Sequence, residues 1–288
     1  MRGNKNLSYI GLDTNFAIFK IQNIGGMMFL NNKFTNYYST TLLGLIILAG
    51  LLSNAIAEEH NHSWGYEGGT GPAHWGEMEQ DHEKHLMCRE GVRQSPIDFN
   101  HVPGLKLDGL HIHYSDTPIN LINNTHTILL KYQTGSYVEW EGEKFELIQV
   151  HFHHPSEHTV NGKSFPMEIH FVHRSGDHKY IVIGVLARIG QSDPIIQKLW
   201  NNIPATIDQE HLVKNIYVNV ESLFPDLKGY FYYSGSLTTP PCSENVTWFV
   251  LEEPIELSEK QVKHFQRFID HNARPVQKQH HRIVVKLK

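Results

Sequence analysis

Residues Glu146–Val160 read ELIQVHFHHPSEHTV, and they carry the most informative pattern in the chain. On an extended strand, side chains two residues apart point to the same face. His151 and His153 therefore project together, with Gln149 beside them, while Phe152 turns to the opposite face. The pattern predicts a strand that presents a histidine pair on one side.

A second strand pattern, Met167–His173 (MEIHFVH), places Glu168 and His170 on one face by the same rule. If the two strands are neighbours, three imidazoles converge on one point. Three neutral histidines that leave a coordination position open are typical of catalytic zinc sites, whereas structural zinc sites usually close all positions with cysteine. We therefore predict a Zn²⁺ site made by His151, His153 and His170.

Each histidine ligand also needs an acceptor for its second ring nitrogen. Gln149 can serve His151, and Glu168 can serve His170, each from two positions before its ligand. The alternative is a histidine pair on an exposed strand with no metal, which is a common arrangement. The third histidine and the matched acceptors favour the metal.

Most of the chain after residue 58 consists of short segments rich in Val, Ile, Phe and Tyr between turn residues, which predicts strands. The segments are His111–Ser115, Thr127–Tyr132, Tyr137–Trp140, Phe145–His153, Met167–His173, Tyr180–Ile189, Asn215–Val220, Gly229–Ser234, Val246–Leu251 and Ile283–Leu287. No internal repeat or low-complexity linker interrupts them. We expect one mostly-β domain with a few short helices at its periphery.

Two helices have start signals. Asp193-Pro194 supplies a cap and a first-turn proline before an apolar segment. Ser258 and Gln261 form a capping box. Apolar residues follow the capping box at helical spacing and indicate a face packed on the core: Val262, Phe265, Phe268 and Ile269.

The bulk composition is that of an ordinary folded chain. Of its 288 residues, 40% are hydrophobic and 19% are charged, which argues against disorder. The formal net charge is -5 and no basic stripe is present, so we do not expect a nucleic acid partner. Histidine is unusually frequent, at 21 residues. Several of these histidines lack coherent ligand spacing, and we interpret them as solvated surface residues rather than metal scavengers: His60, His62, His74, His82, His85, His280 and His281.

The N-terminal region has the features of an export signal. Residues 41–52 (TLLGLIILAGLL) form an apolar run, and Ala55-Ile56-Ala57 follows as a cleavage pattern. The run is shorter than the roughly 20 residues that span a bilayer, so we prefer a cleaved signal to a retained membrane anchor. We predict an N-terminal extension plus signal peptide over residues 1–57, cleavage after Ala57, and a mature domain over 58–288. The periplasm is the preferred location, with secretion as the alternative.

The chain has two cysteines, Cys88 and Cys242, and both lie in the predicted mature domain. In an oxidising compartment two cysteines usually pair. Export therefore favours a disulfide, and two unrelated buried thiols are the alternative.

Several segments, taken together and in order, resemble the α-class carbonic anhydrases. Besides the two histidine strands they are Ser63–Tyr66 (SWGY), Gln94–Ile97 (QSPI), Ser156–Val160 (SEHTV), Ser236–Pro241 (SLTTPP) and Asn272–Pro275 (NARP). The resemblance covers roughly residues 63 to 288. It implies a single domain on a large twisted, mainly antiparallel central sheet, and an enzyme that interconverts carbon dioxide and bicarbonate with Zn²⁺. A monomer or a homodimer is expected.

The resemblance also implies roles for individual residues. The three histidines would bind zinc, with Gln149, Glu168 and the backbone carbonyl of Asn272 as their outer partners. Thr238 would accept a hydrogen bond from hydroxide on the metal and donate its own proton to Glu157. The family pairing of Cys88 with Cys242 would brace the loop that carries Thr238.

The substrate and the proton would have separate places in such a site. Thr239 would line the bicarbonate end. His126 stands at the family's proton-shuttle position, and a histidine can exchange protons with buffer near neutral pH. Tyr66 would join the same water network, although Leu129 replaces a polar residue that often orders it. An apolar wall would receive carbon dioxide, and plain core packing is the alternative for its members: Val172, Val182, Leu237, Val246 and Trp248.

A non-catalytic zinc-binding relative on the same fold is the competing interpretation. Such relatives typically lack one or more of the zinc histidines. This chain keeps all three, together with Glu157 and Thr238.

Overall fold

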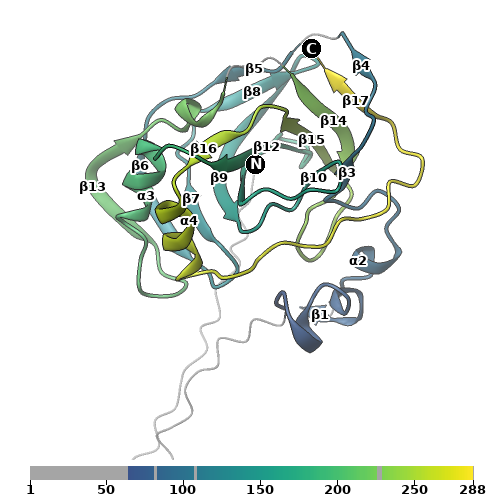
Figure 1. The fold of residues 1–288 in the computed structure, drawn as a ribbon, viewed down its shortest axis with the longest axis horizontal. Coiled ribbons are helices and arrows are strands. Elements are labelled where there is room, and N and C mark those ends of the chain that lie inside the picture. The colour runs from purple at the N-terminus through teal and green to yellow at the C-terminus, as the bar shows by residue number, and fades with distance from the viewer. Residues whose placement is uncertain (1–63, 81–82, 107–108, 226–228, 288) are drawn as a thin grey trace, which may run out of the picture. The chain divides into compact units, whose positions relative to one another are not determined.

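The computed structural model describes residues 64–80, 83–106, 109–225 and 229–287. They belong to one compact unit, residues 61–288 (Figure 1). The predicted signal segment and its cleavage site after Ala57 lie outside the described residues. Within the described ranges, no helix is long and apolar enough to span a membrane.

The secondary structure is mostly strand. The strands are β1 (Glu79–Gln80), β2 (Glu83–Lys84), β3 (Asp98–Phe99), β4 (Gly104–Leu105), β5 (His111–His113), β6 (Thr117–Asn123), β7 (Ile128–Lys131), β8 (Tyr137–Trp140), β9 (Glu143–His153), β10 (Thr159–Val160), β11 (Met167–Arg174), β12 (Tyr180–Ile189), β13 (His211–Val218), β14 (Tyr230–Gly235), β15 (Val246–Leu251), β16 (Ile255–Leu257) and β17 (Val284–Leu287). The helices are α2 (Met87–Glu90), α3 (Pro194–Trp200) and α4 (Glu259–Gln266), with 3₁₀ turns η1 (Gly68–Thr70), η2 (Trp75–Glu77) and η3 (Val220–Leu223).

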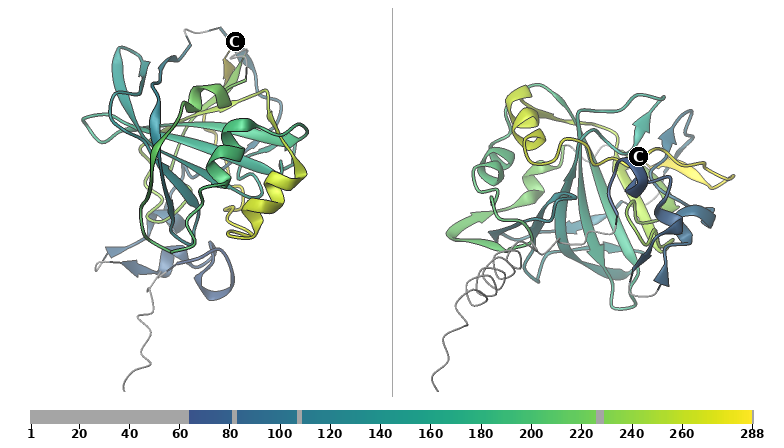
Figure 2. Two further views of the ribbon diagram at one scale, coloured as in Figure 1. Left: turned by 90° about the vertical axis from the view of Figure 1, so that its left-hand side faces the viewer. Right: turned by 90° about the horizontal axis from the view of Figure 1, so that it is seen from below.

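One large sheet dominates the unit. Its strand order is β13-β6-β7-β9-β11-β12-β15-β14-β17-β4, with β8 paired to β9, β5 to β8, and β16 to β12. Most pairs are antiparallel, and the parallel ones are β12–β15, β12–β16 and β17–β4. The large, mainly antiparallel sheet predicted from the resemblance is confirmed. Figure 2 shows how strongly it twists.

The two central strands β11 and β12 are buried on both faces because a hydrophobic cluster lies on each side of the sheet. Alternation sends Phe171 into the larger cluster and Val172 into the smaller one. His170 shares the face of Val172. The side chains of the histidine pattern therefore sit on the face with the smaller cluster, which leaves room for a cavity.

Strand β6 is absent from the sequence-based expectation, and it contains Pro118 near its start. A proline cannot donate to a strand ladder and usually argues against a central strand. In the sheet, Pro118 pairs only with Tyr217 of β13, because β7 pairs with β6 from Leu121 onward. At Pro118 strand β6 therefore has a partner on one side only, as an edge strand does, and proline is tolerated in such strands. Strand β13 also begins earlier than expected, at His211.

Both predicted helices are confirmed, and their caps are those expected from the sequence. Asp193 accepts from the amide of Ile196 at the start of α3, and Ser258 and Gln261 form the capping box of α4. The helices lie side by side (Figure 1), joined by a hydrogen bond of 3.0 Å from the Trp200 indole to the Gln261 carbonyl. Gln261 thus serves both as a cap and as an interhelical link.

A disulfide joins Cys88 in α2 to Cys242 in the loop after β14, across a sequence separation of 154. The predicted pairing is present. The amide of Cys242 donates to the carbonyl of Thr239 at 2.9 Å. The bridge therefore fastens the N-terminal segment to the loop that carries Thr238 and Thr239.

Candidate active site

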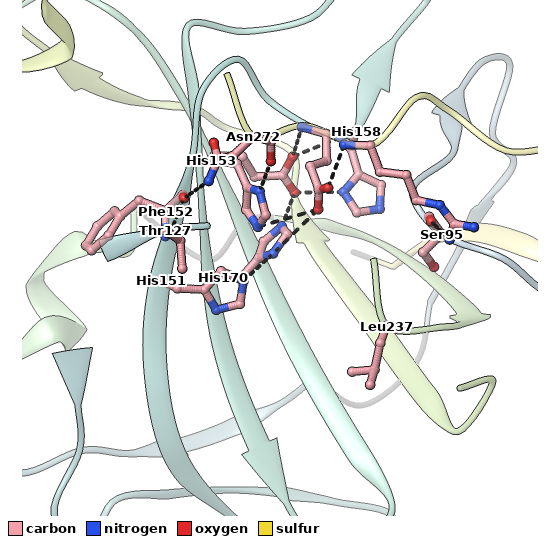
Figure 3. Close-up of polar contacts among 12 residues, drawn as sticks. Ser95, Thr127, His151, Phe152, His153, His158, His170, Leu237 and Asn272 are labelled. Carbon is pink, nitrogen blue, oxygen red and sulfur yellow. Dashed lines mark hydrogen bonds and ion pairs between the residues drawn. The ribbon is translucent and has the colours of Figure 1, made fainter. Parts of the chain in front are cut away.

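Strand register brings the three histidines of the sequence pattern together. In the antiparallel pair β9–β11, His151 stands directly opposite His170, and His153 stands opposite Glu168. The two strands are thus neighbours. One nitrogen of each imidazole lies within 4.8 Å of the others, and the three rings face a common point (Figure 3).

The outer nitrogen of each imidazole has its own acceptor. The pairs are His151 Nδ1 with Gln149 Oε1 at 2.9 Å, His153 Nδ1 with the Asn272 carbonyl at 2.7 Å, and His170 Nε2 with Glu168 Oε1 at 2.9 Å. An acceptor holds the ring proton on the outer nitrogen. The inner nitrogens, Nε2 of His151 and His153 and Nδ1 of His170, therefore keep their lone pairs.

These lone pairs fit a tetrahedral zinc ion. The inner nitrogens of His151 and His170 lie 3.2 Å apart, and a tetrahedron with Zn–N bonds of about 2.0–2.1 Å has an edge of about 3.3–3.4 Å. Two lone pairs at that distance repel each other unless a cation lies between them. His153 Nε2 is buried and has no hydrogen-bond partner among the described residues.

The electrostatic setting keeps these rings neutral. Burial lowers the pKa of His153 to about 4. Burial and the neighbouring imidazoles lower the pKa of His151 well below its usual range, and burial lowers that of His170. A metal ion would therefore meet three unprotonated nitrogens near neutral pH, with no proton to displace.

Glu168 is a buried carboxylate that accepts from four donors. Its Oε1 accepts from His170 and from His158 Nδ1 at 2.7 Å, and its Oε2 accepts from the amides of Glu157 and His158, both at 2.9 Å. Burial alone would raise its pKa, but His158 and His170 outweigh burial and hold the pKa well below its usual range. Gly184, opposite His170, leaves space for it, since a Cβ there would lie 2.9 Å from Oε1.

A hydrogen-bonded chain leads from Glu168 away from the histidines. His158 Nε2 lies 2.6 Å from the Tyr233 hydroxyl, which lies 2.8 Å from Ser95 Oγ. All of these side chains are buried. Sequence reasoning missed this chain, although His158 and Ser95 belong to the SEHTV and QSPI segments, because nothing local indicates that they meet.

Glu157 lies beside the same point. Its Oε1 accepts from the Arg274 amide at 2.9 Å, and its Oε2 lies 3.5 Å from His153 Nε2. Burial raises its pKa to about 7, against the opposing effects of His170, the Thr238 hydroxyl and the Arg274 amide. Oε2 has no hydrogen-bond partner among the described residues, so Thr238 is close without meeting hydrogen-bond geometry.

A cavity of about 240 Å³ opens beside His151 and His170. It is lined by Ile148, Gln149, His151, His170, Val172, Tyr180, Val182, Leu237, Thr238, Thr239 and Trp248. The lining combines apolar side chains with polar ones, and the volume suits a small molecule with a few waters. Val246 packs in one hydrophobic cluster with Val172 and Trp248, which line the cavity, but it is not itself among the lining residues, and its place in the apolar wall stays a prediction.

Ile148 and Tyr180 line this cavity and were missed from the sequence. Ile148 has the opposite parity to Gln149, and strict alternation would turn it away. The register between β9 and β11 shifts at this point, since Gln149 stands opposite Val172 but Leu147 stands opposite His173. This bulge brings Ile148 and Gln149 to the same cavity.

His126 lies in the turn between β6 and β7. Asn124 Oδ1 accepts from the amides of His126 and Thr127 at 3.2 and 2.8 Å, which shapes the turn. The imidazole stacks on Trp64 with ring centroids 3.7 Å apart. A second cavity is lined by both of these rings and by Tyr66, Leu129, Thr239 and the two converging histidines of β9, among others. His126 and His151 therefore open on one space.

A large, mainly antiparallel sheet with three converging histidines, two of which line a cavity that also carries apolar side chains, is the fold and site of the α-carbonic anhydrases. The sequence model of the eukaryotic-type carbonic anhydrases matches residues 70–288, and the chain belongs to this family. It is an enzyme of the carbonic anhydrase class.

Relatives and solved structures agree with this assignment. A carbonic anhydrase of Nostoc sp. strain PCC 7120 is 40% identical over 252 residues, which cover 85% of this chain and 94% of the relative. A hyperthermostable carbonic anhydrase from a hydrothermal vent chimney matches with a TM-score of 0.74 at 42% identity, over 78% of this chain and 100% of that chain. The Thermovibrio ammonificans enzyme, solved with the inhibitor sulfanilamide, matches with a TM-score of 0.73 at 41% identity, over 78% and 98%.

Proposed function

We propose that this protein catalyses the reversible hydration of carbon dioxide to bicarbonate and a proton, with Zn²⁺ held by His151, His153 and His170. The convergence of three neutral imidazole nitrogens, each with its outer N–H bound to an acceptor, carries this proposal. When bound, zinc supplies Lewis-acid activation that makes hydroxide available near neutral pH, a chemistry for which carbonic anhydrase is the standard example.

The apolar side of the cavity binds carbon dioxide. Four apolar side chains line this part of the cavity: Val172, Val182, Leu237 and Trp248. The only hydrogen-bonding group among these side chains is the Trp248 indole N–H, and it already donates to the Ser236 carbonyl at 3.0 Å. A wall without polar groups binds water weakly, so a linear apolar molecule can displace the water and occupy the wall. The product is charged, so it leaves this wall for the polar side at Thr239.

Glu157 and Thr238 orient the nucleophile. Glu157 Oε2 is buried and lacks a donor among the described residues, and the Thr238 hydroxyl is the neighbouring group that can supply one. Once that hydroxyl donates to Glu157, its oxygen can only accept from the nucleophile, which leaves a nucleophile lone pair directed at the substrate. A cation among the histidines favours the ionised form of Glu157 that this arrangement needs.

The proton leaves through the second cavity. His126 lines it together with Tyr66, and both share that space with His151. Burial, and then the charge of Glu157, raise the pKa of Tyr66 well above its usual range, so Tyr66 stays protonated and serves as a fixed donor. Leu129 contributes no polar group to the water path, so we assign the proton transfer to His126, with Tyr66 as a fixed hydrogen-bond donor in the same cavity.

We also propose that the chain is exported, with cleavage after Ala57 and a mature domain over residues 58–288. The Cys88–Cys242 disulfide supports an oxidising compartment. The periplasm remains the preferred location and secretion the alternative. We expect a monomer or a homodimer.

The test is stopped-flow carbon dioxide hydration on the mature protein, with tightly held zinc counted in the same sample. We expect rapid hydration with one tightly held zinc per chain, and the loss of both in His151→Ala. His211→Ala, which removes an exposed histidine from β13, is the matched control and should change neither. One tight zinc without hydration would instead establish the non-catalytic zinc-binding relative.

A further inference from the structure

The backbone of the zinc site has a simple geometry that can be sought elsewhere in the chain. Two histidines, His151 and His153, lie two residues apart on one strand. The third ligand, His170, stands directly opposite the first of them on an antiparallel neighbour. All three side chains therefore share one face of the sheet.

Strand β5 and its neighbour β8 repeat this arrangement. His111 and His113 lie two residues apart on β5, and Glu139 of β8 stands directly opposite His111 in an antiparallel pair. From this juxtaposition we propose a second metal site, formed by His111, His113 and Glu139, for a divalent transition-metal ion such as Cu²⁺ or Zn²⁺. Nothing in the proposed hydration reaction uses these residues.

The three side chains are exposed, and the face they share is set by the packing beneath them. Ile112 stands opposite Val138 in the same strand pair, and Val138 is fully buried. Alternation therefore turns His111, His113 and Glu139 toward solvent together. Residues two apart on a strand lie about 7 Å apart, and directly opposed residues have Cβ atoms about 4.5–5.5 Å apart. The backbone register is that of the zinc site. The donor atoms of His151, His153 and His170 already converge, whereas the exposed side chains of His111, His113 and Glu139 must turn toward one another to meet one ion.

The donor atoms are free to bind. His111 and Glu139 make no hydrogen bond or ion pair among the described residues. Lys144 of β9 stands opposite Glu139, but its ammonium lies 3.1 Å from Glu146 Oε1 and 4.2 Å from the centroid of the Tyr137 ring. That ammonium is thus engaged elsewhere, and the Glu139 carboxylate is left unpaired.

His113 is partly oriented by its neighbour. Its ring stacks on Tyr137 with centroids 4.7 Å apart and an angle of 25° between the planes. Stacking uses the face of the imidazole, whereas metal ions bind to its nitrogens in the ring plane. The contact therefore limits the rotation of His113 without blocking its lone pair.

The donor set determines which ions fit. Two imidazoles and one carboxylate suit divalent ions of intermediate softness, whereas Mg²⁺ and Ca²⁺ prefer oxygen donors alone. Cu²⁺ should bind more tightly than Zn²⁺, following the general order of divalent affinities. The described structure provides no buried acceptors to orient His111, so this site should exchange its metal more readily than the zinc site does.

The test compares metal binding by the zinc-loaded mature protein and its variants, using calorimetric titration with Cu²⁺ and EPR of the bound ion. His111→Asn with His113→Asn should bind one Cu²⁺ fewer than the parent and lose nitrogen coupling from two imidazoles. Glu139→Gln should keep the stoichiometry but weaken binding about tenfold. Circular dichroism establishes that each variant is folded.

The matched control is His280→Asn with His281→Asn, which removes two exposed histidines that are adjacent rather than two apart. This pair should leave the Cu²⁺ count of the β5 site unchanged. The proposal is wrong if the His111/His113 variant binds as much Cu²⁺ as the parent. It is also wrong if the zinc-loaded parent binds no further ion.

Discussion

Glu168→Gln changes one carboxylate oxygen to an NH₂ group and almost nothing in shape, yet we expect it to disable the metal site. All four contacts of Glu168 are with groups that donate to it. A glutamine side chain has only one acceptor oxygen. One pair of donors must therefore face the new NH₂ group.

The two orientations of the amide fail in different ways. With NH₂ in the place of Oε2, the buried amides of Glu157 and His158 lose their acceptor. With NH₂ in the place of Oε1, His158 and His170 must accept instead of donate at the nitrogens that face it. The proton of His170 then moves to Nδ1, which is the nitrogen that faces His151 Nε2 at 3.2 Å and that would bind zinc.

The magnitudes follow from these contacts. An unsatisfied buried donor destabilises by about 1–3 kcal/mol, so two of them lower the free energy of unfolding by about 2–6 kcal/mol. Loss of an outer partner typically weakens metal affinity about 10–100-fold. In the second orientation His170 is lost as a ligand, so we expect zinc affinity to fall by at least the upper end of that range.

Zinc affinity would be measured by competition with a chromophoric chelator, and stability by guanidinium unfolding of the metal-free protein. The matched control is Gln149→Glu, since Gln149 Oε1 accepts only from His151 and a carboxylate preserves that acceptor. It should hold zinc within a few-fold of the parent. The reasoning fails if Glu168→Gln binds zinc as tightly as the parent and unfolds at the same denaturant concentration.

Three further predictions concern other parts of the molecule. Replacing Cys88 and Cys242 by serine opens a loop with a sequence separation of 154. The chain-entropy relation then predicts that the free energy of unfolding falls by about 5 kcal/mol. A change below about 1 kcal/mol in denaturant unfolding would contradict this prediction. Burial lowers the pKa of His173 to about 3, below its unfolded value of about 6.5. The unfolded chain therefore takes up this proton first, and stability falls as pH drops from about 6.5 toward 3, by up to about 1.4 kcal/mol per pH unit. His173→Gln should flatten unfolding free energy against pH by that slope, and an unchanged slope would refute the assignment. His126→Ala should slow hydration about tenfold or more in weak buffer, with recovery in imidazole and unchanged zinc content, whereas full activity without imidazole would exclude His126 as the shuttle.

Local rules were enough for the parts of the site that lie on one strand. A strand repeats every two residues, so the spacing of His151 and His153 placed them on one face, and Gln149 and Glu168 each preceded a ligand by one repeat. The caps of α3 and α4 each join residues only three positions apart, so the sequence was enough to predict them. The large, mainly antiparallel sheet was expected from the resemblance to a known family, and the order of its strands was not predicted, since no residue pattern shows which strands are neighbours.

Tertiary structure alone decided what depends on distant pairing. The register of β9 against β11 sets His151 opposite His170, and the bulge in that pair turns Ile148 into the cavity against its parity. The contact of His158 with Tyr233 joins residues separated by 75 positions. Val246 has the same apolar character as Val172 and Trp248 and packs in one cluster with them, yet of these three only Val172 and Trp248 line the cavity. The chemistry of a side chain is local, but its neighbours across the sheet are selected by the packing of the whole unit.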